Sequence, residues 1–250
     1  MVSIVIMAGG LGKRMNSDLP KVLHKVGNYP MLVHVIKTSL DMNVNKIIII
    51  VGKFKNLIKE EVSKYFTYEE LNKIIYIIQS EANGTGHAIQ CANEEIKNLN
   101  ENIIILSGDT PLISKLSLLE MIEKSDNSKC VLMVRNTNNN KGLGRILLKN
   151  DTFNKIVEEK DASDDEKKIT LVNCGIYMIH SSLINEYIFN LNNNNNQKEY
   201  YLTDLISIIK NNNFDVTLFE LSNEKTFELI GVNNLDELRQ LNEIYKKICI

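Results

Sequence analysis

The sequence predicts an α/β protein with a mostly parallel, doubly wound sheet, and three observations support this fold class. Short runs of β-branched apolar residues recur in the first half, at Ile4–Ile6, Ile47–Val51, Ile74–Ile78 and Ile103–Leu106. Continuous apolar runs of this length suit strands that are covered on both faces. Stretches with helical apolar spacing lie between them. Repeated strand–helix–strand units favour a parallel sheet with helices on both of its faces.

Each further element follows from its local pattern. The helices expected in the first half are Met31–Met42, Asn56–Tyr65, Gly86–Ile96 and Ser114–Glu123, the last with a serine N-cap. The second half is expected to carry a small β insertion, the hairpin-like pair Gly144–Leu148 and Lys155–Glu159, before a buried strand at Leu171–Met178. The later helices are Ser181–Asn190, Leu202–Lys210 and an amphipathic closing helix at Leu235–Ile248. The tract Asn192–Asn196 is expected to be a flexible surface loop without a packing role.

Bulk composition excludes several classes of protein. The 250 residues are 44% hydrophobic and 24% charged, which is ordinary for a globular chain with a sizeable core. A net charge of −2 gives no overall basic field, so nucleic acid is not an expected partner. Without a long apolar run or a signal peptide, a cytosolic protein without a membrane partner is expected. The histidines are dispersed, and the cysteines (Cys91, Cys130, Cys174, Cys249) form no Cys-x-x-Cys pair; three of them are interpreted as small core residues, and no metal or redox site is expected.

Polar or glycine-rich segments follow three of the predicted strands directly. They are Gly9–Arg14 after the first strand, Gln79–Gly86 after the third and Ser107–Asp109 after the fourth. Ligands of an open parallel sheet bind in the crevice beyond the carboxyl ends of the strands. The sequence therefore predicts that these three segments share one ligand-binding crevice.

The first of these segments suits a triphosphate. Its glycines let backbone N–H groups approach phosphate oxygens. Arg14 can bind two oxygens at once, and Lys21 adds a mobile positive charge. The spacing matches neither a Walker loop nor Gly-x-Gly-x-x-Gly. A tight strand-to-helix turn that carries surface cations is the alternative interpretation.

The other two segments indicate a metal ligand and a base-binding loop. Asp109 directly follows a buried strand, and Mg²⁺ takes oxygen donors of this kind. A cap in a turn or helix is the alternative role for Asp109. The Gln79 amide offers a donor and an acceptor, which match the edge of a pyrimidine. The alternative for Gly84–Gly86 is a simple helix cap, and His87 is interpreted as structural.

Two features of the second half are ambiguous by themselves. The run Glu158–Asp161 is expected to be mostly exposed to solvent, as charge clusters usually are. Asn173 lies within an apolar strand, where its amide needs a hydrogen-bond partner, either the backbone or a ligand hydroxyl.

Together these motifs resemble the uridylyltransferase (pyrophosphorylase) domain of the bacterial bifunctional N-acetylglucosamine-1-phosphate uridylyltransferases. The resemblance covers nearly the whole chain. The N-terminal loop and Gly108-Asp109 are shared by nucleotidyltransferases for many sugars, whereas Glu199–Asp204 and Gly231–Asn234 are more specific for the N-acetylglucosamine enzymes. The other matching segments are Ala8–Lys21, Gly84–Ala88, Gly108–Ile113, Gly142–Ile146, Ile156–Ala162 and Asn173–Ile176.

The resemblance implies a sheet of the nucleotide-diphospho-sugar transferase type and one nucleotidyltransferase domain over residues 1–250. A nucleotide-binding half would span about 1–111, and a sugar-binding half with the closing helix about 112–250. The implied reaction joins UTP and N-acetylglucosamine 1-phosphate into UDP-N-acetylglucosamine and pyrophosphate, with Mg²⁺ as cofactor. The implied nucleotide contacts are Ala8, Gly9, Gly10, Gln79, Gly84 and Thr85; the catalytic residues are Arg14, Lys21 and Asp109; the metal ligands are Asp109 and Asn233; and the sugar contacts are Gly144, Glu158, Asn173, Tyr201 and Thr203.

The chain also departs from the family pattern. Leu11 and Lys13 replace a basic residue followed by Thr, and Ser107 and Leu143 stand where the bacterial enzymes often have tyrosines. Sugar selectivity therefore stays open, and a nucleotidyltransferase for glucose 1-phosphate or a deoxythymidine diphosphate sugar is one alternative. A catalytically silent nucleotide-sugar sensor is another. The acetyltransferase β-helix is missing, so acetyl-CoA chemistry is not expected, and the oligomeric state is not fixed because that β-helix organises the bacterial trimer.

Overall fold

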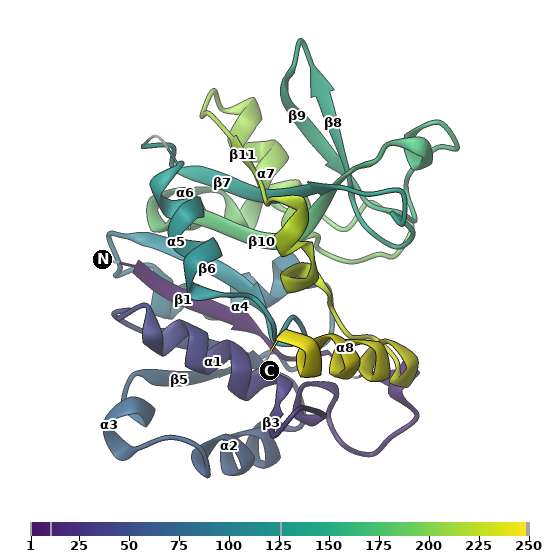
Figure 1. Ribbon diagram of the computed structural model, residues 1–250. Coiled ribbons are helices and arrows are strands. Elements are labelled where there is room, and N and C mark those ends of the chain that lie inside the picture. Colours follow the sequence, from purple (N-terminus) through teal and green to yellow (C-terminus); the bar gives the residue numbers. More distant parts are fainter. Residues whose placement is uncertain (1, 11, 126, 249–250) are drawn as a thin grey trace.

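The computed structural model describes residues 2–10, 12–125 and 127–248, and its centre is a nine-stranded sheet (Figure 1). The main strands lie in the order β11 (Thr217–Glu220), β7 (Cys130–Asn136), β10 (Leu171–His180), β6 (Asn102–Ser107), β1 (Val2–Met7), β4 (Ile47–Val51) and β5 (Ile74–Ile78). β10 is antiparallel to both of its neighbours, β6 and β7. The other pairs are parallel: β1 with β4, β1 with β6, β4 with β5, and β7 with β11. The predicted mostly parallel sheet is confirmed.

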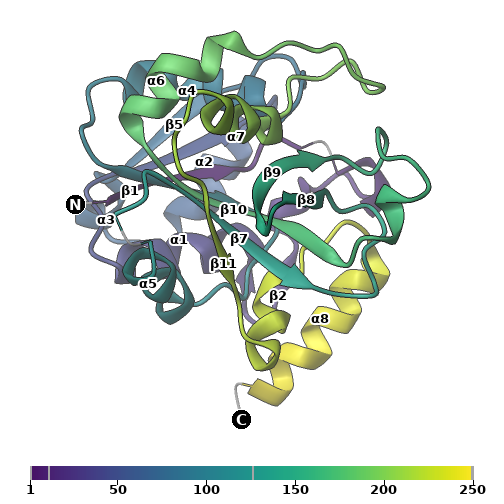
Figure 2. The same ribbon diagram turned by 90° about the horizontal axis from the view of Figure 1, so that it is seen from above.

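Helices cover both faces of this sheet (Figures 1 and 2). One face packs against α1 (Met31–Asp41), α2 (Lys55–Ser63) and α5 (Lys115–Glu123), and the other against α4 (Thr85–Ile96), α6 (Ser181–Tyr187) and α7 (Leu202–Asn211). Alternating side chains of β1 supply both cores, since Ile4 and Ile6 lie in one and Val5 in the other. The doubly wound arrangement is therefore confirmed, as is the N-cap of α5, where Ser114 Oγ accepts the Ser117 N–H.

The predicted β insertion is present as a hairpin. β8 (Arg145–Lys149) pairs antiparallel with β9 (Thr152–Val157) and is joined to β10 at its base. Asn150 and Asp151 make the turn with φ values of 51° and 57°, the left-handed region that tight hairpin turns use. The sequence analysis did not predict β7 or β11.

The closing helix α8 (Leu235–Ile248) packs beside the first half of the chain (Figure 1). It lies against a two-stranded sheet of β2 (Lys25–Val26) and β3 (Tyr29–Pro30), and a separate apolar cluster joins Val26, Met31 and Leu241. A short helix α3 (Tyr68–Leu71) precedes β5. None of the helices within the described ranges is long and apolar enough to cross a bilayer.

Two predictions for the second half need correction. The helix expected at Ser181–Asn190 ends at Tyr187 and continues as a 3₁₀ turn. The asparagine tract is a surface loop, but it makes specific contacts, because its amides can both donate and accept. The Asn196 side chain donates to Lys160 O at 2.8 Å, and its backbone N–H donates to Asp161 Oδ1 at 2.9 Å. Leu11, the side chain of Lys13 and Cys249 lie outside the described residues.

Candidate functional site

The three segments predicted to share a crevice do meet at one edge of the sheet. From β1 the chain proceeds outward to β4 and β5, and it then returns to β6 on the other side of β1. This reversal leaves a crevice beyond the carboxyl ends of β1 and β6. The segments are fixed to neighbouring strand ends: Gln79 N–H donates to Val51 O at 2.8 Å, and Gly108 N–H to Met7 O at 2.9 Å. A cleft of about 260 Å³ lies between them.

The loop after β1 folds back over the segment that carries Lys21. Gly12 has φ of 59°, and a Cβ there would lie 2.7 Å from Lys21 Cβ, so only glycine allows this approach. Short 3₁₀ turns follow at Lys13–Met15 and Lys21–Leu23, and the first long helix begins only at Met31. Within the described residues, the loop is therefore followed by short 3₁₀ turns, and no long helix begins directly after it.

Four side chains form a cluster that we call the cation cluster: Arg14, Lys21, Asp109 and Asn233. Lys21 Nζ makes an ion pair with Asp109 Oδ2, and both side chains are mostly buried. Asn233 Oδ1 lies 3.1 Å from the Arg14 guanidinium and 3.4 Å from Lys21 Nζ. The sequence analysis expected Arg14, Lys21 and Asp109 in one crevice from their places at the strand ends, and it added Asn233 only through the family resemblance; the structure brings all four within contact distance.

The contacts of Asp109 distinguish between its two possible roles. Its side chain accepts a hydrogen bond from Ser107 Oγ at 2.7 Å as well as the ion pair from Lys21, and its backbone carbonyl accepts the Val232 N–H at 3.0 Å. The carboxylate therefore faces the crevice, while the Asp109 backbone carbonyl ties this strand end to the segment before α8. No backbone N–H cap is formed by this side chain in the described part of the chain, which disfavours a purely capping role.

The donor set of this cluster fits Mg²⁺. Asp109 and Asn233 each offer a hard oxygen atom to the same ammonium group, that of Lys21, so both oxygens already face a cation. Nowhere in residues 2–10, 12–125 and 127–248 do three or more His, Cys, Asp or Glu side chains gather as a metal cage. Two protein oxygens completed by water and phosphate are typical of Mg²⁺ in nucleotide sites.

The cleft beside the cation cluster is lined by the residues predicted to contact the nucleotide. Gln79 is 9% exposed, and its Nε2 donates to Gly84 O at 2.9 Å and lies 3.3 Å from His87 Nδ1. Gly84 has φ of 104°, and a Cβ there would lie 2.5 Å from Tyr200 O, so this loop depends on glycine. His87 Nδ1 also lies 3.1 Å from Glu81 O, so its ring is held against the same loop. The predicted residues that line the cleft are Ala8, Gly9, Gly10, Gln79, Gly84 and Thr85.

The residues predicted to contact the sugar lie around the base of the hairpin. Thr203 Oγ1 donates to Glu158 Oε1 at 2.8 Å, and the Gly144 carbonyl accepts the Asn173 N–H at 2.9 Å. The Asn173 amide donates to Tyr177 Oη at 2.7 Å and accepts the Gly175 N–H at 3.1 Å. The expected partner of Asn173 therefore exists within the protein.

The run Glu158–Asp161, which we call the acidic turn, is not mostly exposed as predicted. Only Lys160 is exposed, because the three carboxylates are held by side chains from elsewhere in the chain. Glu158 binds Thr203, Glu159 forms an ion pair with Arg145 at 2.6 Å, and Asp161 accepts a hydrogen bond from Tyr201 Oη at 3.1 Å. The turn is thus a built element rather than a solvated charge cluster.

Burial sets the electrostatics of this turn. It raises the pKa of Glu158, with smaller contributions from the neighbouring Asp204 and Asp161 carboxylates, and the Thr203 hydrogen bond opposes the shift. Burial also raises the pKa of Tyr201 to about 12, so its hydroxyl stays protonated. Glu158 is consequently an acceptor whose charge is costly in the fold, which is typical of a group that meets a ligand hydroxyl or amide.

One segment connects the acidic turn to the cleft. Asn196 bonds the turn at Lys160 and Asp161, as described above. A few residues later, Tyr200 exchanges backbone hydrogen bonds with Asn83 at 2.8 Å and Gly86 at 2.7 Å, and the Leu202 N–H donates to Thr85 Oγ1 at 3.0 Å. Residues 195–202, here called the connecting segment, therefore contact both parts of the site. The sequence analysis missed this because no local pattern indicates what the asparagines contact.

A doubly wound sheet whose crevice gathers two cations, a carboxylate and a base-sized cleft defines a nucleotide-binding protein of the α/β class. The chain belongs to the nucleotidyl transferase family, whose family model matches residues 3–223. The expected family is confirmed.

Sequence relatives narrow the family. The chain is 39% identical over 247 residues to a protein of Acanthamoeba polyphaga mimivirus named "Probable UDP-N-acetylglucosamine pyrophosphorylase", with 97% of this chain and 96% of that protein covered. It is 38% identical over 246 residues to the "Bifunctional protein GlmU" of Buchnera aphidicola, with 98% of this chain covered. The match spans 53% of that bifunctional protein, so the chain covers about half of its length.

Solved structures agree on the fold. A UDP-glucose pyrophosphorylase complexed with UDP-glucose superposes with a TM-score of 0.73 at 14% identity, over 98% of both chains. HddC from Yersinia pseudotuberculosis gives a TM-score of 0.70 at 21% identity, over 98% of this chain and all of that one. At these identities the likeness concerns the fold alone, and it confirms the predicted nucleotide-diphospho-sugar transferase architecture.

Proposed function

We propose that this chain transfers a uridylyl group from UTP to N-acetylglucosamine 1-phosphate, producing UDP-N-acetylglucosamine and pyrophosphate. The cation cluster beside the cleft is the observation that carries the proposal, because it places positive charge where a triphosphate would lie. The names of the relatives that match over nearly the whole chain support the choice of nucleotide and sugar.

Each part of the site has a role in this proposal. Gln79 and the glycine loops would bind uracil and ribose in the cleft, and Arg14 and Lys21 would bind the phosphates. Asp109 and Asn233 would hold Mg²⁺, which neutralises phosphate charge when bound. Lys21 is already paired with Asp109, so an incoming triphosphate competes for an ammonium group that is in position. Gly144, Glu158, Asn173, Tyr201 and Thr203 would surround the amino sugar.

The reaction needs no general base. The phosphate oxygen of the sugar phosphate is already anionic, so it can attack the α-phosphorus directly. A new P–O bond forms there as the bond to the departing pyrophosphate breaks. Alignment and charge neutralisation by Arg14 and Lys21 then account for catalysis.

Another sugar 1-phosphate is the second candidate substrate. The observation that favours this candidate is Ser107, which stands where the family often has a tyrosine. The Ser107 hydroxyl donates a hydrogen bond to Asp109 instead. A catalytically silent sensor is less well supported, since both cations and Asp109 are present and in contact. The expectation of a cytosolic enzyme and the open oligomeric state stay predictions.

A pyrophosphate-release panel tests the proposal. UTP, dTTP, CTP and GTP are each combined with N-acetylglucosamine, glucose and galactosamine 1-phosphates in the presence of Mg²⁺. We expect UTP with N-acetylglucosamine 1-phosphate to give the highest kcat/KM. A higher value for glucose 1-phosphate or dTTP would select the second candidate, and no turnover with any pair would favour the sensor.

A further inference from the structure

Arg145 is a buried charge to which the proposed function assigns no role. Its side chain is 1% exposed and is the largest fully buried side chain among the described residues. Removing a guanidinium from water costs free energy unless its N–H groups find acceptors. Such a side chain at the first residue of β8, next to Gly144, calls for a physical reason.

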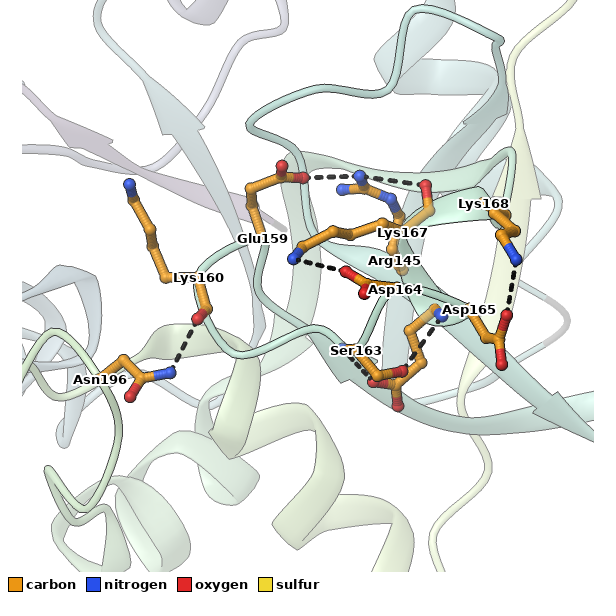
Figure 3. A network of polar contacts seen from close by, with 10 residues as sticks. Arg145, Glu159, Lys160, Ser163, Asp164, Asp165, Lys167, Lys168 and Asn196 are labelled. Carbon is orange, nitrogen blue, oxygen red and sulfur yellow. Dashed lines mark hydrogen bonds and ion pairs between the residues drawn. The ribbon is translucent and has the colours of Figure 1, made fainter.

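The guanidinium contacts the acidic turn and two neighbouring segments, and Figure 3 shows its bonds to Glu159 and Lys167. It donates to the backbone carbonyl of Leu143, to Glu159 Oε2 at 2.6 Å and to Lys167 O at 3.4 Å. Its Nε has no hydrogen-bond partner within the described residues, so the contacts are concentrated on the terminal nitrogens. Arg145 therefore joins the hairpin base, the acidic turn and the loop at Lys167.

Glu159 transmits this constraint to Glu158. Burial alone would raise the pKa of Glu159, but the Arg145 hydrogen bond, the Gly142 N–H and the nearby cations outweigh it and lower that pKa. Glu159 consequently stays charged beside Arg145. The next residue back, Glu158, has its Oε1 3.6 Å from the position of a Cβ on Gly144. A shift of Glu159 would therefore move Glu158 relative to Gly144.

The other ion pairs of this region are of a different kind. Lys168 and Asp165 lie 2.7 Å apart with side chains 76% and 92% exposed, and Lys167 and Asp164 are similarly solvated. Exposed pairs of this type contribute little to geometry or stability. Among the cations labelled in Figure 3, Arg145 is the one whose side chain is drawn bonded to the acidic turn, through Glu159, and that side chain is buried.

We propose that Arg145 is a positioning residue for the sugar-phosphate substrate: it fixes Glu159 and thereby presents Glu158 beside Gly144. The inference rests on the proposed function, in which Glu158 and Gly144 contact the sugar. It assigns to Arg145 an effect on sugar binding and none on the nucleotide cleft.

Steady-state kinetics of R145Q, R145K, E159Q and R145Q/E159Q test the proposal, with K168Q as a matched control from the exposed pair. We expect R145Q to raise KM for the sugar 1-phosphate by on the order of tenfold to a hundredfold, with KM for UTP within about twofold of the wild type. R145K restores one bond and should recover part of the loss. The double variant should be no worse than R145Q, because both changes break the same contact. K168Q should match the wild type.

An equal rise in both KM values, or an unchanged KM for the sugar phosphate in R145Q and E159Q, overturns the assignment. The kinetics use whichever sugar 1-phosphate the wild type turns over, so a different sugar refutes the proposed function without deciding this one. Amide hydrogen exchange of the full chain tests the positioning role of Arg145 without depending on turnover. Peptides covering Glu158–Asp161 should exchange faster in R145K and E159Q than in the wild type, with Gln79–Gln90 unchanged, and equal exchange in the acidic turn contradicts the proposal.

Discussion

The crevice at the strand ends and the acidic turn hold their functional side chains in different ways. In the crevice the backbone does most of the positioning, since Gly108 and Gln79 are hydrogen-bonded to the ends of neighbouring parallel strands. In the acidic turn each carboxylate is fixed by a side chain from a distant part of the chain: Glu158 by Thr203, Glu159 by Arg145 and Asp161 by Tyr201.

This difference separates what is general from what is particular in the site. Backbone positioning depends on sheet topology and tolerates sequence change, so it suits the triphosphate of the proposed reaction. Side-chain positioning depends on residue identity, so single substitutions there can alter which sugar is accepted. We therefore expect changes in the crevice to affect the rate most, and changes in the acidic turn to affect sugar binding most.

The largest effect is expected from Asp109→Asn. The amide keeps an acceptor for Ser107 Oγ, so the fold should persist, but the negative charge that faces the cations is lost. We expect kcat/KM to fall by on the order of a thousandfold, measured by pyrophosphate release with Mg²⁺. Glu95→Gln is the control, since it neutralises the carboxylate of the Lys46–Glu95 pair (3.2 Å) near the opposite end of α4 and should leave turnover unchanged. Retention of more than a tenth of the activity by Asp109→Asn would contradict its role.

Lys21→Met should cost about a hundredfold in kcat/KM, or about 3 kcal/mol, since it removes one charge-stabilising group. Methionine keeps most of the side-chain volume, and Arg14 would still contact Asn233 at 3.1 Å. The loss should be accompanied by a higher KM for UTP and an unchanged KM for the sugar phosphate. Lys46→Met makes the same change in the distant ion pair and should be silent. If Lys21→Met affects mainly sugar binding, the division between the two regions is wrong.

How far the sequence predicts each region follows from the same difference. The crevice could be predicted because its parts are local: a buried strand is followed at once by Gly9–Arg14, and another by Ser107–Asp109. The contacts of the acidic turn could not be predicted, because its partners are distant along the chain. Arg145 is 14 residues from Glu159, Thr203 is 45 residues from Glu158, and Tyr201 is 40 residues from Asp161. A local pattern of four charged residues indicates exposure unless those partners are known.

The missed strands have a similar explanation. β11 has only four residues and lies at the edge of the sheet, so its pairing with β7 is what makes it a strand. β7 is a continuous apolar run, Cys130–Val134, whose cysteine and methionine carry little strand preference, and the sequence analysis left it unassigned. Pairing with neighbouring strands, rather than local sequence, therefore makes β7 and β11 strands.

Glu158→Gln should separate stability from sugar binding. The pKa of Glu158 is raised in the fold, mainly by burial, so its contribution to stability is fully present below its ordinary pKa of 4.5 and is lost as pH rises through the raised value. The glutamine variant should therefore have a higher Tm than the wild type at pH 8, and this advantage should vanish below pH 4.5. Its KM for the sugar phosphate should rise by about tenfold, because an acceptor with full charge is lost.

Glu166→Gln should shift Tm in the opposite direction from Glu158→Gln, because the pKa of Glu166 is lowered in the fold. Hydrogen bonds from the Ser163 backbone and hydroxyl lower the pKa of Glu166, so its stabilisation is present above pH 4.5 and lost as pH falls below it. This variant should lower Tm slightly at pH 8 and leave sugar binding unchanged. Should Glu158→Gln also lower Tm at pH 8, the cost of its buried charge has been assigned wrongly.

Among the variants expected to weaken sugar binding, Asn196→Ala should have the smallest effect. It removes the side-chain bond from the connecting segment to Lys160 O and keeps the backbone bond to Asp161. Loss of one exposed hydrogen bond should lower the free energy of unfolding by at most about 1 kcal/mol in urea denaturation. Because this segment also contacts Gly86 through Tyr200, KM for the sugar phosphate should rise a few-fold and KM for UTP by less. Asn194→Ala alters an exposed side chain of the same tract and should change neither value. Equal effects of the two variants would mean that the connecting segment needs only its backbone to hold the acidic turn.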